Sequence, residues 1–467
     1  VAHDAIDDVR GMSYGGVMSA HPALVAVQDR LNGTLLLPDD VGYEEARKPW
    51  NLAIEQRPAA VATPADVDDL RMLLAAAREA GLRLAVQPSG HGASDSLTGA
   101  VLVRMSAFDA LEIDLEKGTA RVGSGVRWGA VVDALEGSGW AAPAGTSPVV
   151  SVAGYTLGGG HSWFSRTAGL GSDNLRAAWV LRPDGTHGRV DDDTDPDLLW
   201  ALRGAAGIVG IVTALELDLV GAPEIWGAAL TFDVADAPSV VRAVRDLAAS
   251  APPTLNVFLN SMRMPDAPQL PAEIRGRSFL TVQALSTDGP QPALIDTVRR
   301  AGTVRDEITG PTSPGALAAA SNEPTDPTPG RGASIALSVL DDSTIDALLE
   351  FRELPEQWPI MGIDIRMLGG ALDAPRRSGF ASLESAGWLL HALAPVIPGV
   401  PAEPAESSLA AFRELLAPNE ASQTVTTFLE PDQTLDRCGS PDDIARLRDL
   451  RARFDPDAVL HDGRLPR

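Results

Sequence analysis

The sequence predicts an α+β fold for its first half and two or three domains for the whole chain. The chain has 467 residues, which is more than one ordinary domain contains. Hydrophobic residues make up 45% of it, which is enough for buried cores. From residue 63 to about residue 220, segments with helical periodicity alternate with short apolar segments that are typical of strands.

The first of these elements is a helix expected over residues 63–81. Thr63 is placed to cap it, Asp66 stands where a capping box has an acidic residue, and Gly81 ends it. A strand expected over 82–87 leads directly into a glycine-rich loop. The later elements of this half are strands at 100–105 and 119–125, a helix at 128–139, two strands around a Pro-Asp-Gly turn within 174–190, a helix at 196–207 and a strand at 208–220.

The composition changes after Gly221, where Pro and Ala become common and glycine-rich loops become rare. We expect a second domain from there to about residue 425. Within it, residues 312–334 have the composition of a mobile surface loop. The chain ends in a charged amphipathic helix, starting near residue 442, whose packing partner the pattern does not reveal.

Charge and cysteine content exclude several kinds of site. The formal net charge is −25 and no basic cluster offsets it, so we expect neither nucleic-acid nor membrane binding. Cys438 is the only cysteine, which rules out an internal disulfide and a cysteine zinc site, and we predict no metal site. No apolar run has membrane-spanning length, and residues 1–30 lack a signal-peptide pattern. We therefore expect a cytoplasmic protein, although a chain beginning with Val leaves a removed leader open.

Two glycine-rich segments carry the main chemical signal. They are "QPSGHGASDS" at 87–96 and a longer segment at 143–174. Glycine lets backbone N–H groups approach a ligand, so two such loops suit an extended cofactor that bears phosphates. A G-x-S-x-G match at 11–15 lacks the strand and helix that a serine-hydrolase elbow needs.

The ordered motifs resemble the vanillyl-alcohol-oxidase superfamily, and most closely its berberine-bridge-enzyme-like oxidases. The matching stretches, in chain order, are "SGHGAS", "PAGTSPVVSVAGYTLGGGHS", "GLGSDN", "LLWALRGAAGIVGIV", "RMLGGAL" and "RLRDLRARFDPDAVL". Each motif alone is weak, but their order is specific, and the resemblance runs from about residue 35 to the end. It implies a two-part PCMH-type FAD-binding domain at 1–222, with an extension at 1–34. It also implies a substrate domain at 223–427, with an antiparallel sheet covered by helices, and a segment at 428–467 that returns to the first domain.

The resemblance further implies that FAD is attached covalently to His91 through its 8α-methyl carbon. A neutral imidazole is nucleophilic, which agrees with this role; a histidine that only caps a turn is the alternative. Ser147 stands where many members have a second, cysteinyl link, so we predict one link. The positions expected to line the cofactor are Ser89, Gly90, His91, Gly92, Ser94, Thr146, Ser147, Val150, Ser151, Gly154, Tyr155, Gly159 and Val212.

The chain departs from the family at its catalytic positions. Thr427 replaces an asparagine that contacts the flavin region, Asp462 stands at another asparagine position, and no tyrosine follows Tyr155 to act as base. The candidates to face the flavin and carry catalysis are Tyr155, His161, Asp364, Arg366 and Glu430, each with a structural role as the alternative.

The resulting prediction is an FAD-dependent oxidase of a small organic molecule. A hydride would pass from an alcohol, an amine or an activated C–H bond to the flavin, and O2 would reoxidise the flavin and give H2O2. A flavin dehydrogenase with another electron acceptor and a degenerate non-redox flavin protein or cyclase are the alternatives. The sequence identifies neither the substrate nor the oligomeric state.

Overall fold

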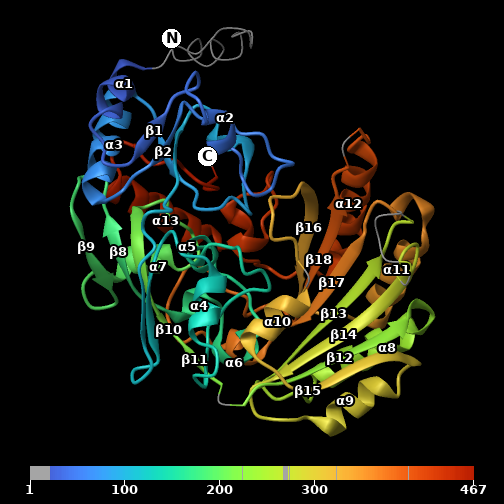
Figure 1. Cartoon of the computed structure of the whole chain (residues 1–467). Coiled ribbons are helices and arrows are strands. Elements are labelled where there is room, and N and C mark those ends of the chain that lie inside the picture. The colour runs from blue at the N-terminus through green and yellow to red at the C-terminus, as the bar shows by residue number, and fades with distance from the viewer. Residues whose placement is uncertain are drawn as a thin grey trace.

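The computed structural model describes residues 21–222, 224–266, 272, 274–321, 323–397 and 399–466. The match at 11–15, Tyr14, the leader region and most of the predicted extension at 1–34 lie outside these residues. Figure 1 shows two bodies: the first half of the chain with its C-terminal end, and a large sheet built from the second half. The candidate site lies where the two bodies meet.

The first body begins with a small four-stranded sheet in the order β1-β2-β4-β3. Strand β4 pairs in parallel with β2 and β3, and β1 pairs antiparallel with β2. Its elements are α1 (Pro22–Gln28), β1 (Thr34–Leu36), α2 (Tyr43–Ala46), β2 (Ala60–Thr63), α3 (Val67–Ala80), β3 (Leu84–Val86) and β4 (Val101–Val103).

The start of α3 corrects one expectation. The helix begins at Val67, and its cap is Asp66, whose carboxylate accepts hydrogen bonds from the backbone N–H groups of Asp68 and Asp69. Thr63 does not cap it, because Thr63 is the last residue of β2 and pairs there with Thr34. An acidic side chain is as good a cap as a threonine, so local pattern alone placed the start too early.

A second, five-stranded antiparallel sheet completes this body, in the order β5-β6-β10-β8-β9. Its strands are β5 (Leu111–Asp114), β6 (Thr119–Gly123), β8 (Leu175–Leu181), β9 (His187–Asp191) and β10 (Ile211–Asp218). The helices beside it are α4 (Trp128–Ala134), α5 (Val152–Leu157), α6 (Ser165–Ala168) and α7 (Pro196–Leu202), and β7 (Trp140–Ala141) pairs with β11 (Val220–Gly221).

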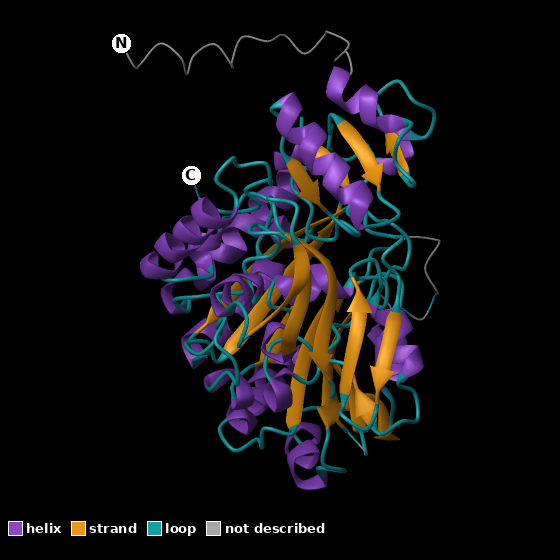
Figure 2. Cartoon of the chain, turned by 90° about the vertical axis from the view of Figure 1, so that its left-hand side faces the viewer, coloured by secondary structure: helices purple, strands orange, loops and turns teal. Residues whose placement is uncertain are grey.

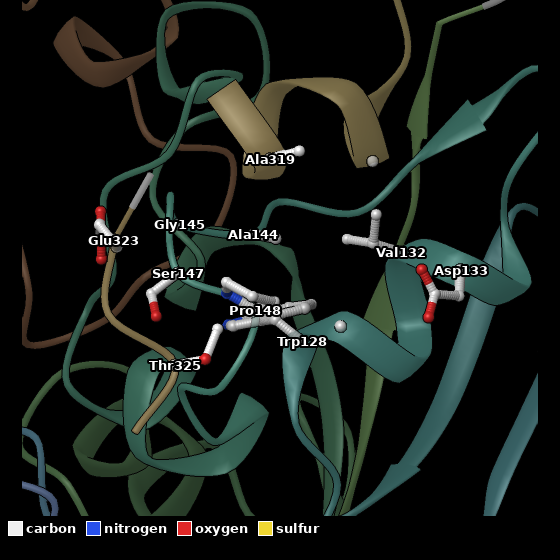
Figure 3. A pocket seen from close by; sticks show the side chains of 12 residues that line it. Trp128, Val132, Asp133, Ala144, Gly145, Ser147, Pro148, Ala319, Glu323 and Thr325 are labelled. Carbon is white, nitrogen blue, oxygen red and sulfur yellow. The ribbon is translucent and has the colours of Figure 1, made fainter. Parts of the chain in front are cut away.

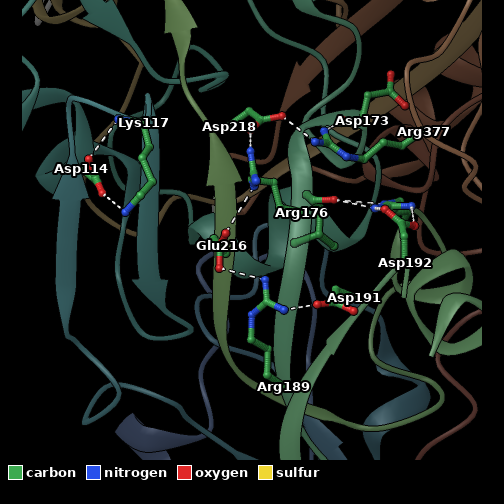
Figure 4. Close-up of polar contacts among 12 residues, drawn as sticks. Asp114, Lys117, Asp173, Arg176, Arg189, Asp191, Asp192, Glu216, Asp218 and Arg377 are labelled. Carbon is green, nitrogen blue, oxygen red and sulfur yellow. Dashed lines mark hydrogen bonds and ion pairs between the residues drawn. The ribbon is translucent and has the colours of Figure 1, made fainter. Parts of the chain in front are cut away.

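Charged side chains tie the second half of the chain to this sheet (Figure 4). Asp218 of β10 pairs with Arg176 of β8 at 2.9 Å and with Arg377 at 2.7 Å. Arg203, 1% exposed, pairs with Asp192 at 2.7 Å and donates to the backbone oxygen of Ser378. Because Arg203 is buried, its pairing matters more for stability than the exposed ion pairs do.

The second body is a seven-stranded antiparallel sheet in the order β15-β12-β14-β13-β17-β18-β16. Its strands are β12 (Trp226–Asp233), β13 (Leu255–Arg263), β14 (Ser278–Ser286), β15 (Val304–Pro311), β16 (Gly330–Leu337), β17 (Gly362–Met367) and β18 (Trp388–Pro395). Its helices are α8 (Ala237–Ala248), α9 (Pro292–Arg299), α10 (Pro314–Ser321), α11 (Asp342–Glu353) and α12 (Glu403–Leu416). The predicted fold class, with an antiparallel sheet covered by helices, is confirmed.

The two faces of this sheet differ because side chains alternate along a strand. Ile363 and Ile365 of β17 and Leu390 of β18 belong to the apolar core under α8, α11 and α12. These helices lie on the side of the sheet away from α4 and α6 (Figure 1). Figure 2, turned by 90°, shows helices (purple) beside the strands (orange). The opposite face meets the first body through a second apolar cluster that includes Phe258 and Trp163.

Residues 312–334 are not a mobile surface loop. They contain α10, which begins with Pro314, and the first half of β16. Alanine is the strongest helix former and proline is favoured in the first helical turn, so the Ala- and Pro-rich composition that suggested a loop also favours a helix.

The C-terminal segment returns to the first body. Helix α13 (Pro441–Phe454) has a capping box between Ser440 and Asp443, and Leu460 forms a parallel bridge with Leu84 of β3. Its packing partner, which the sequence left open, is therefore the first body. Among the described residues, no helix is long and apolar enough to cross a membrane. The exact boundaries of the three predicted domains stay a prediction.

Candidate active site

His91 lies in the loop between β3 and β4, held on both sides. Its ring stacks on Trp50, with centroids 4.1 Å apart and planes 15° from parallel. The Ser89 hydroxyl is 3.1 Å from Nδ1. Among the described residues, the buried Nε2 atom has no hydrogen-bond partner. Gly90 has φ +86°, and a Cβ there would lie 2.8 Å from the Cβ of Pro49, so the turn before the histidine requires glycine.

The surroundings of His91 keep its ring neutral. Burial, and to a lesser degree the positive charge of Arg127, lowers the pKa of His91 from 6.5 to about 4. At neutral pH the imidazole therefore has an unprotonated nitrogen, as a nucleophile requires.

A short strap, defined here as Trp50 and Asn51, links this loop to the second body. The backbone N–H of Trp50 donates to Ser89, and that of Asn51 donates to Gly90. The Asn51 side chain exchanges two hydrogen bonds with the backbone of Gly330, the first residue of β16. The strap therefore fixes the histidine loop against the large sheet.

The second glycine-rich segment is organised around Tyr155, whose ring is buried. A Cβ at Gly160 would clash with that ring, and one at Gly145 or Gly171 would lie 3.1 or 2.8 Å from it. The edge of the ring meets Trp128 at a centroid distance of 5.5 Å. Packing on Tyr155 thus accounts for three glycines of this segment, and the structure gives Tyr155 a core role. Its role at the flavin stays a prediction.

The remaining predicted cofactor positions are placed as follows. Ser151 caps α5 by accepting a hydrogen bond from Gly154, and Ser94 lies 2.6 Å from Ser96 between their hydroxyl oxygens. Gly92 and Gly154 have open space or ordinary contacts where a Cβ would stand, whereas Gly159 has φ +96° and packs on Val425. Val150 packs on the edge of the core, and the buried Val212 pairs with Val180 in the five-stranded sheet. The role of these positions as cofactor ligands stays a prediction.

Buried polar atoms near His91 and the second glycine-rich segment are available to bind a polar ligand. Buried polar groups in folded proteins almost always have hydrogen-bond partners. Here many lack one among the described residues, and they concentrate in the strap, the two glycine-rich segments and the turn between them. They include Trp50 Nε1, His91 Nε2, Ser124 Oγ, Trp128 Nε1, Ser147 Oγ and Thr156 Oγ1. Together with the open space beside Gly92, they suit a polar cofactor such as FAD.

A cavity of about 360 Å³ adjoins the second segment (Figure 3). Trp128 and Val132 of α4 line one side, Ser147 a second, and Ala319 of α10 a third. Near it, the Thr146 hydroxyl donates to Glu323, just after α10. The segment expected to be a mobile loop therefore forms a wall of this cavity.

Four of the five predicted catalytic residues gather where the two bodies meet. Arg366 donates to Asp364 at 2.5 Å, and its guanidinium lies over Phe258 and Phe428, at 4.8 and 5.4 Å from their centroids. His161 packs on Phe258 at 5.6 Å, and neither of its ring nitrogens has a partner among the described residues. Burial, then Arg366, lowers the pKa of His161 well below 6.5.

The fourth residue, Glu430, belongs to a hydrogen-bonded group that the sequence analysis missed. Ser334 of β16 donates to Glu430 at 3.3 Å and lies 2.9 Å from Nδ1 of His391 on β18. Burial raises the pKa of Glu430, and burial, then Arg366, lowers that of His391 to about 4. The signal was present in "WLLHALAP", where the histidine interrupts an apolar strand on the face opposite the core. Among the described residues, no cluster could hold a metal ion.

The chain is similar in sequence to FAD-binding proteins. Residues 58–191 match a family described as an FAD binding domain. (R)-6-hydroxynicotine oxidase of Paenarthrobacter nicotinovorans is 28% identical over 244 residues, which are 50% of this chain and 53% of that protein. The chain spans about half the length, or less, of the curated relatives it matches.

Solved structures with the same fold cover almost the whole chain. Wild-type Physcomitrella patens BBE-like 1 has a TM-score of 0.81 at 20% identity and covers 95% of this chain and 99% of its own. Glucooligosaccharide oxidase from Acremonium strictum, whose structure is described as having 6-S-cysteinyl, 8α-N1-histidyl FAD, has a TM-score of 0.78 at 18% identity, covering 94% and 98%. These likenesses confirm the fold, and the family match supports FAD binding around His91.

Proposed function

Because this chain carries an FAD-binding domain and has the fold of the berberine-bridge-enzyme-like flavoproteins, we propose that it is an FAD-dependent oxidase. Its substrate is a small organic molecule that gives up a hydride from an alcohol, an amine or an activated C–H bond. The observation that carries the proposal is His91, a neutral imidazole with an unpartnered buried nitrogen among the described residues, inside the stretch that matches the FAD-binding family.

The residues divide into a cofactor group and a substrate group. His91 attaches the cofactor, Trp50 and Ser89 orient its ring, and the two glycine-rich segments supply backbone N–H groups. Bound FAD supplies the hydride acceptor and, on reoxidation by O2, the source of H2O2. The substrate lies against Phe258 and Phe428, with the Arg366–Asp364 pair beside it, where the second body covers the first. The relatives named as oxidases support this reading.

The experiment is a reduction test on the purified holoprotein. Its flavin absorbance is followed anaerobically with a panel that includes benzyl alcohol, benzylamine, cellobiose and 6-hydroxynicotine, and air is then admitted. An oxidase bleaches with one compound and recovers its colour in air with release of H2O2. Recovery only with an added dye would show a dehydrogenase, and a flavin that dithionite bleaches but no compound of the panel does would show a non-redox protein.

The covalent link gives a separate prediction. After acid precipitation, the wild-type flavin stays with the protein, whereas His91→Ala releases it into the supernatant, because that variant lacks the attaching nitrogen. Ser147→Ala is the control: it retains the flavin in the pellet, since a serine hydroxyl with no nearby base is a poor nucleophile. Free flavin from the wild type would exclude the histidyl link, and loss of attachment in Ser147→Ala would exclude a single link through His91.

A further inference from the structure

Three side chains from three separate segments line up at the sheet face that meets the first body. Ser334 and His391 are directly opposite each other on the paired strands β16 and β18. The Ser334 hydroxyl lies 2.9 Å from His391 Nδ1 and 3.3 Å from Glu430 Oε1. The Ser334 hydroxyl has one proton, and it donates that proton to the Glu430 carboxylate. In its contact with His391 the hydroxyl oxygen is therefore the acceptor, so Nδ1 of His391 carries the proton.

This order leaves the other ring nitrogen free. With the proton on Nδ1, Nε2 of a neutral imidazole is an acceptor, and it makes no hydrogen bond to any residue that the structure describes. The ring lies on the same sheet face as the Arg366–Asp364 pair, because Asp364 pairs in register with His391. Its centroid is 6.5 Å from that of Phe428, which also contacts Arg366.

The backbone makes room for this alignment at one residue. A Cβ on Gly332 of β16 would lie 2.6 Å from Cε1 of His391 and 3.2 Å from Oε1 of Glu430. The φ angle of Gly332 is not in the left-handed region, so its turn geometry does not require glycine. A glycine in the middle of a strand is unfavourable, and here it lets the imidazole and the carboxylate reach the same hydroxyl.

We propose that His391, Ser334 and Glu430 form a proton relay in which Nε2 of His391 takes the proton from the hydroxyl group of an alcohol substrate. The inference rests on the proposed oxidase function and adds its proton acceptor. It assigns His391 as the catalytic base, a role for which the sequence has no tyrosine after Tyr155.

The substrate proton can be followed through the three residues. As the substrate carbon gives up its hydride to the bound cofactor, the substrate O–H bond breaks and its proton goes to Nε2. The Nδ1 proton passes to the Ser334 oxygen, and the Ser334 proton passes to Glu430, which becomes a carboxylic acid. The substrate is oxidised by two electrons to a carbonyl compound, and the net proton rests on Glu430 until it exchanges with solvent.

The charges around the relay favour an alcohol over an amine. Arg366 and Asp364 face His391, and Arg413, Arg464 and Asp432 face Glu430. Burial and Arg366 keep His391 neutral, and burial prepares Glu430 to hold a proton, as the raised pKa of its carboxyl shows. A protonated amine would meet the positive charge of Arg366, whereas a hydroxyl group can donate directly to Nε2.

The first measurement needs no substrate. In oxidised holoprotein labelled with ¹⁵N-histidine, the His391 signals are assigned by their loss in His391→Gln. We expect the proton on Nδ1 at pH 7 in the wild type, and a shift toward the Nε2-protonated form in Ser334→Ala. Ser334→Thr keeps the hydroxyl and restores the wild-type form, and Ser338→Ala, which removes a hydroxyl bonded to Asn419, leaves it unchanged. An Nε2-protonated His391 in the wild type would overturn the relay.

The second measurement is anaerobic flavin reduction by benzyl alcohol and by cellobiose between pH 5 and 9. We expect His391→Gln to slow reduction by about 100-fold with its acid-stable flavin retained, the usual size of a lost general base. Ser334→Ala and Glu430→Gln slow it less, and their deficit shrinks as pH rises; Glu430→Asp recovers part of the rate.

The outcomes separate this inference from the function beneath it. A His391→Gln variant that is reduced as fast as the wild type would overturn the relay and leave the oxidase intact. A wild type that no donor of the panel reduces would overturn the oxidase, and the relay as a catalytic device with it.

Discussion

Val150 lies in the second glycine-rich segment, three residues after Ser147. Its side chain packs on the edge of the large core, and its backbone oxygen accepts a hydrogen bond from the N–H of Trp128. This bond joins the backbone of Val150 to the first residue of α4. From the motif resemblance we propose that this position controls the access of oxygen to reduced flavin, so a single added methylene there has a defined expected effect.

We predict that Val150→Ile slows reoxidation by air by about tenfold, which corresponds to about 1.4 kcal/mol of added barrier. The added methylene stays rigid because β-branched side chains have few rotamers. Stopped-flow mixing of pre-reduced protein with oxygenated buffer measures this rate, and anaerobic reduction by substrate should change little. Val149→Ile is the control. Equal oxygen rates in Val150→Ile and the wild type would show that Val150 only packs the core.

The hydrogen bond of His391 could not be predicted from the sequence. The strand that contains it could be predicted, but its hydrogen-bond partner Ser334 lies 57 positions away on β16, and Glu430, which bonds to Ser334, lies 39 positions away after β18. Nothing in a local pattern pairs those positions. Asp364, Arg366 and Glu430 were predicted only because the chain resembles a family, and the structure shows that they share one region.

At the scale of elements, the strap of Trp50 and Asn51 is short but joins the two bodies at the candidate site. Two residues connect the histidine loop to β16, which also carries Ser334 of the relay. The proposed site of cofactor attachment and the proposed relay are therefore both tied to strand β16. No sequence signal marked the strap, because its bonds are mostly backbone contacts between distant segments.

We predict that Trp50→Leu lowers the fraction of flavin that stays with the protein after acid precipitation, with the total bound flavin less affected. The leucine cannot stack on the imidazole, so His91 loses the orientation that attack on the cofactor requires. Trp358→Leu removes a tryptophan that is 62% exposed and far along the chain, and serves as the control. A fully attached flavin in Trp50→Leu would show that Ser89 and the loop backbone suffice to orient the ring.

The elements themselves were predicted better than their ends. Strands β8 and β9 around their turn, and helices α4 and α7, form where periodicity and turn residues placed them. Helix α3 starts later than expected because Asp66, and not Thr63, caps it. The prediction of a loop at 312–334 was wrong because alanine and proline occur both in loops and at the start of helices. In the structure, the helix α10 of this segment lines the cavity.

At the scale of the whole molecule, the site exists because one sheet has two unlike faces. One face is covered by helices and is apolar, and the other carries Asp364, Arg366 and His391 toward the first body. Closing the two bodies buries these side chains together with histidines of the first body. Burial favours the neutral forms of ionisable groups in the folded protein. The free energy of unfolding therefore depends on pH.

His161 gives the sharpest form of this coupling. Its side chain is 2% exposed, and its folded pKa lies well below the 6.5 of the unfolded chain. Between pH 6.5 and the folded pKa, the unfolded chain binds a proton that the folded protein does not, so stability falls as pH falls. Asp173 acts in the opposite direction, because burial raises its pKa to about 6, but it contributes equally to the wild type and to a His161 variant.

We therefore predict that His161→Leu reduces the loss of stability between pH 7 and pH 5. One proton over about 1.5 pH units corresponds to at most about 2 kcal/mol. Urea unfolding of both proteins at pH 7, 6 and 5 measures the change. Trp163→Phe alters the same aromatic cluster without removing an ionisable group, and it should keep the wild-type dependence. If His161→Leu keeps it too, His161 has the same pKa in the folded and the unfolded chain, which would contradict the lowered pKa of the buried ring.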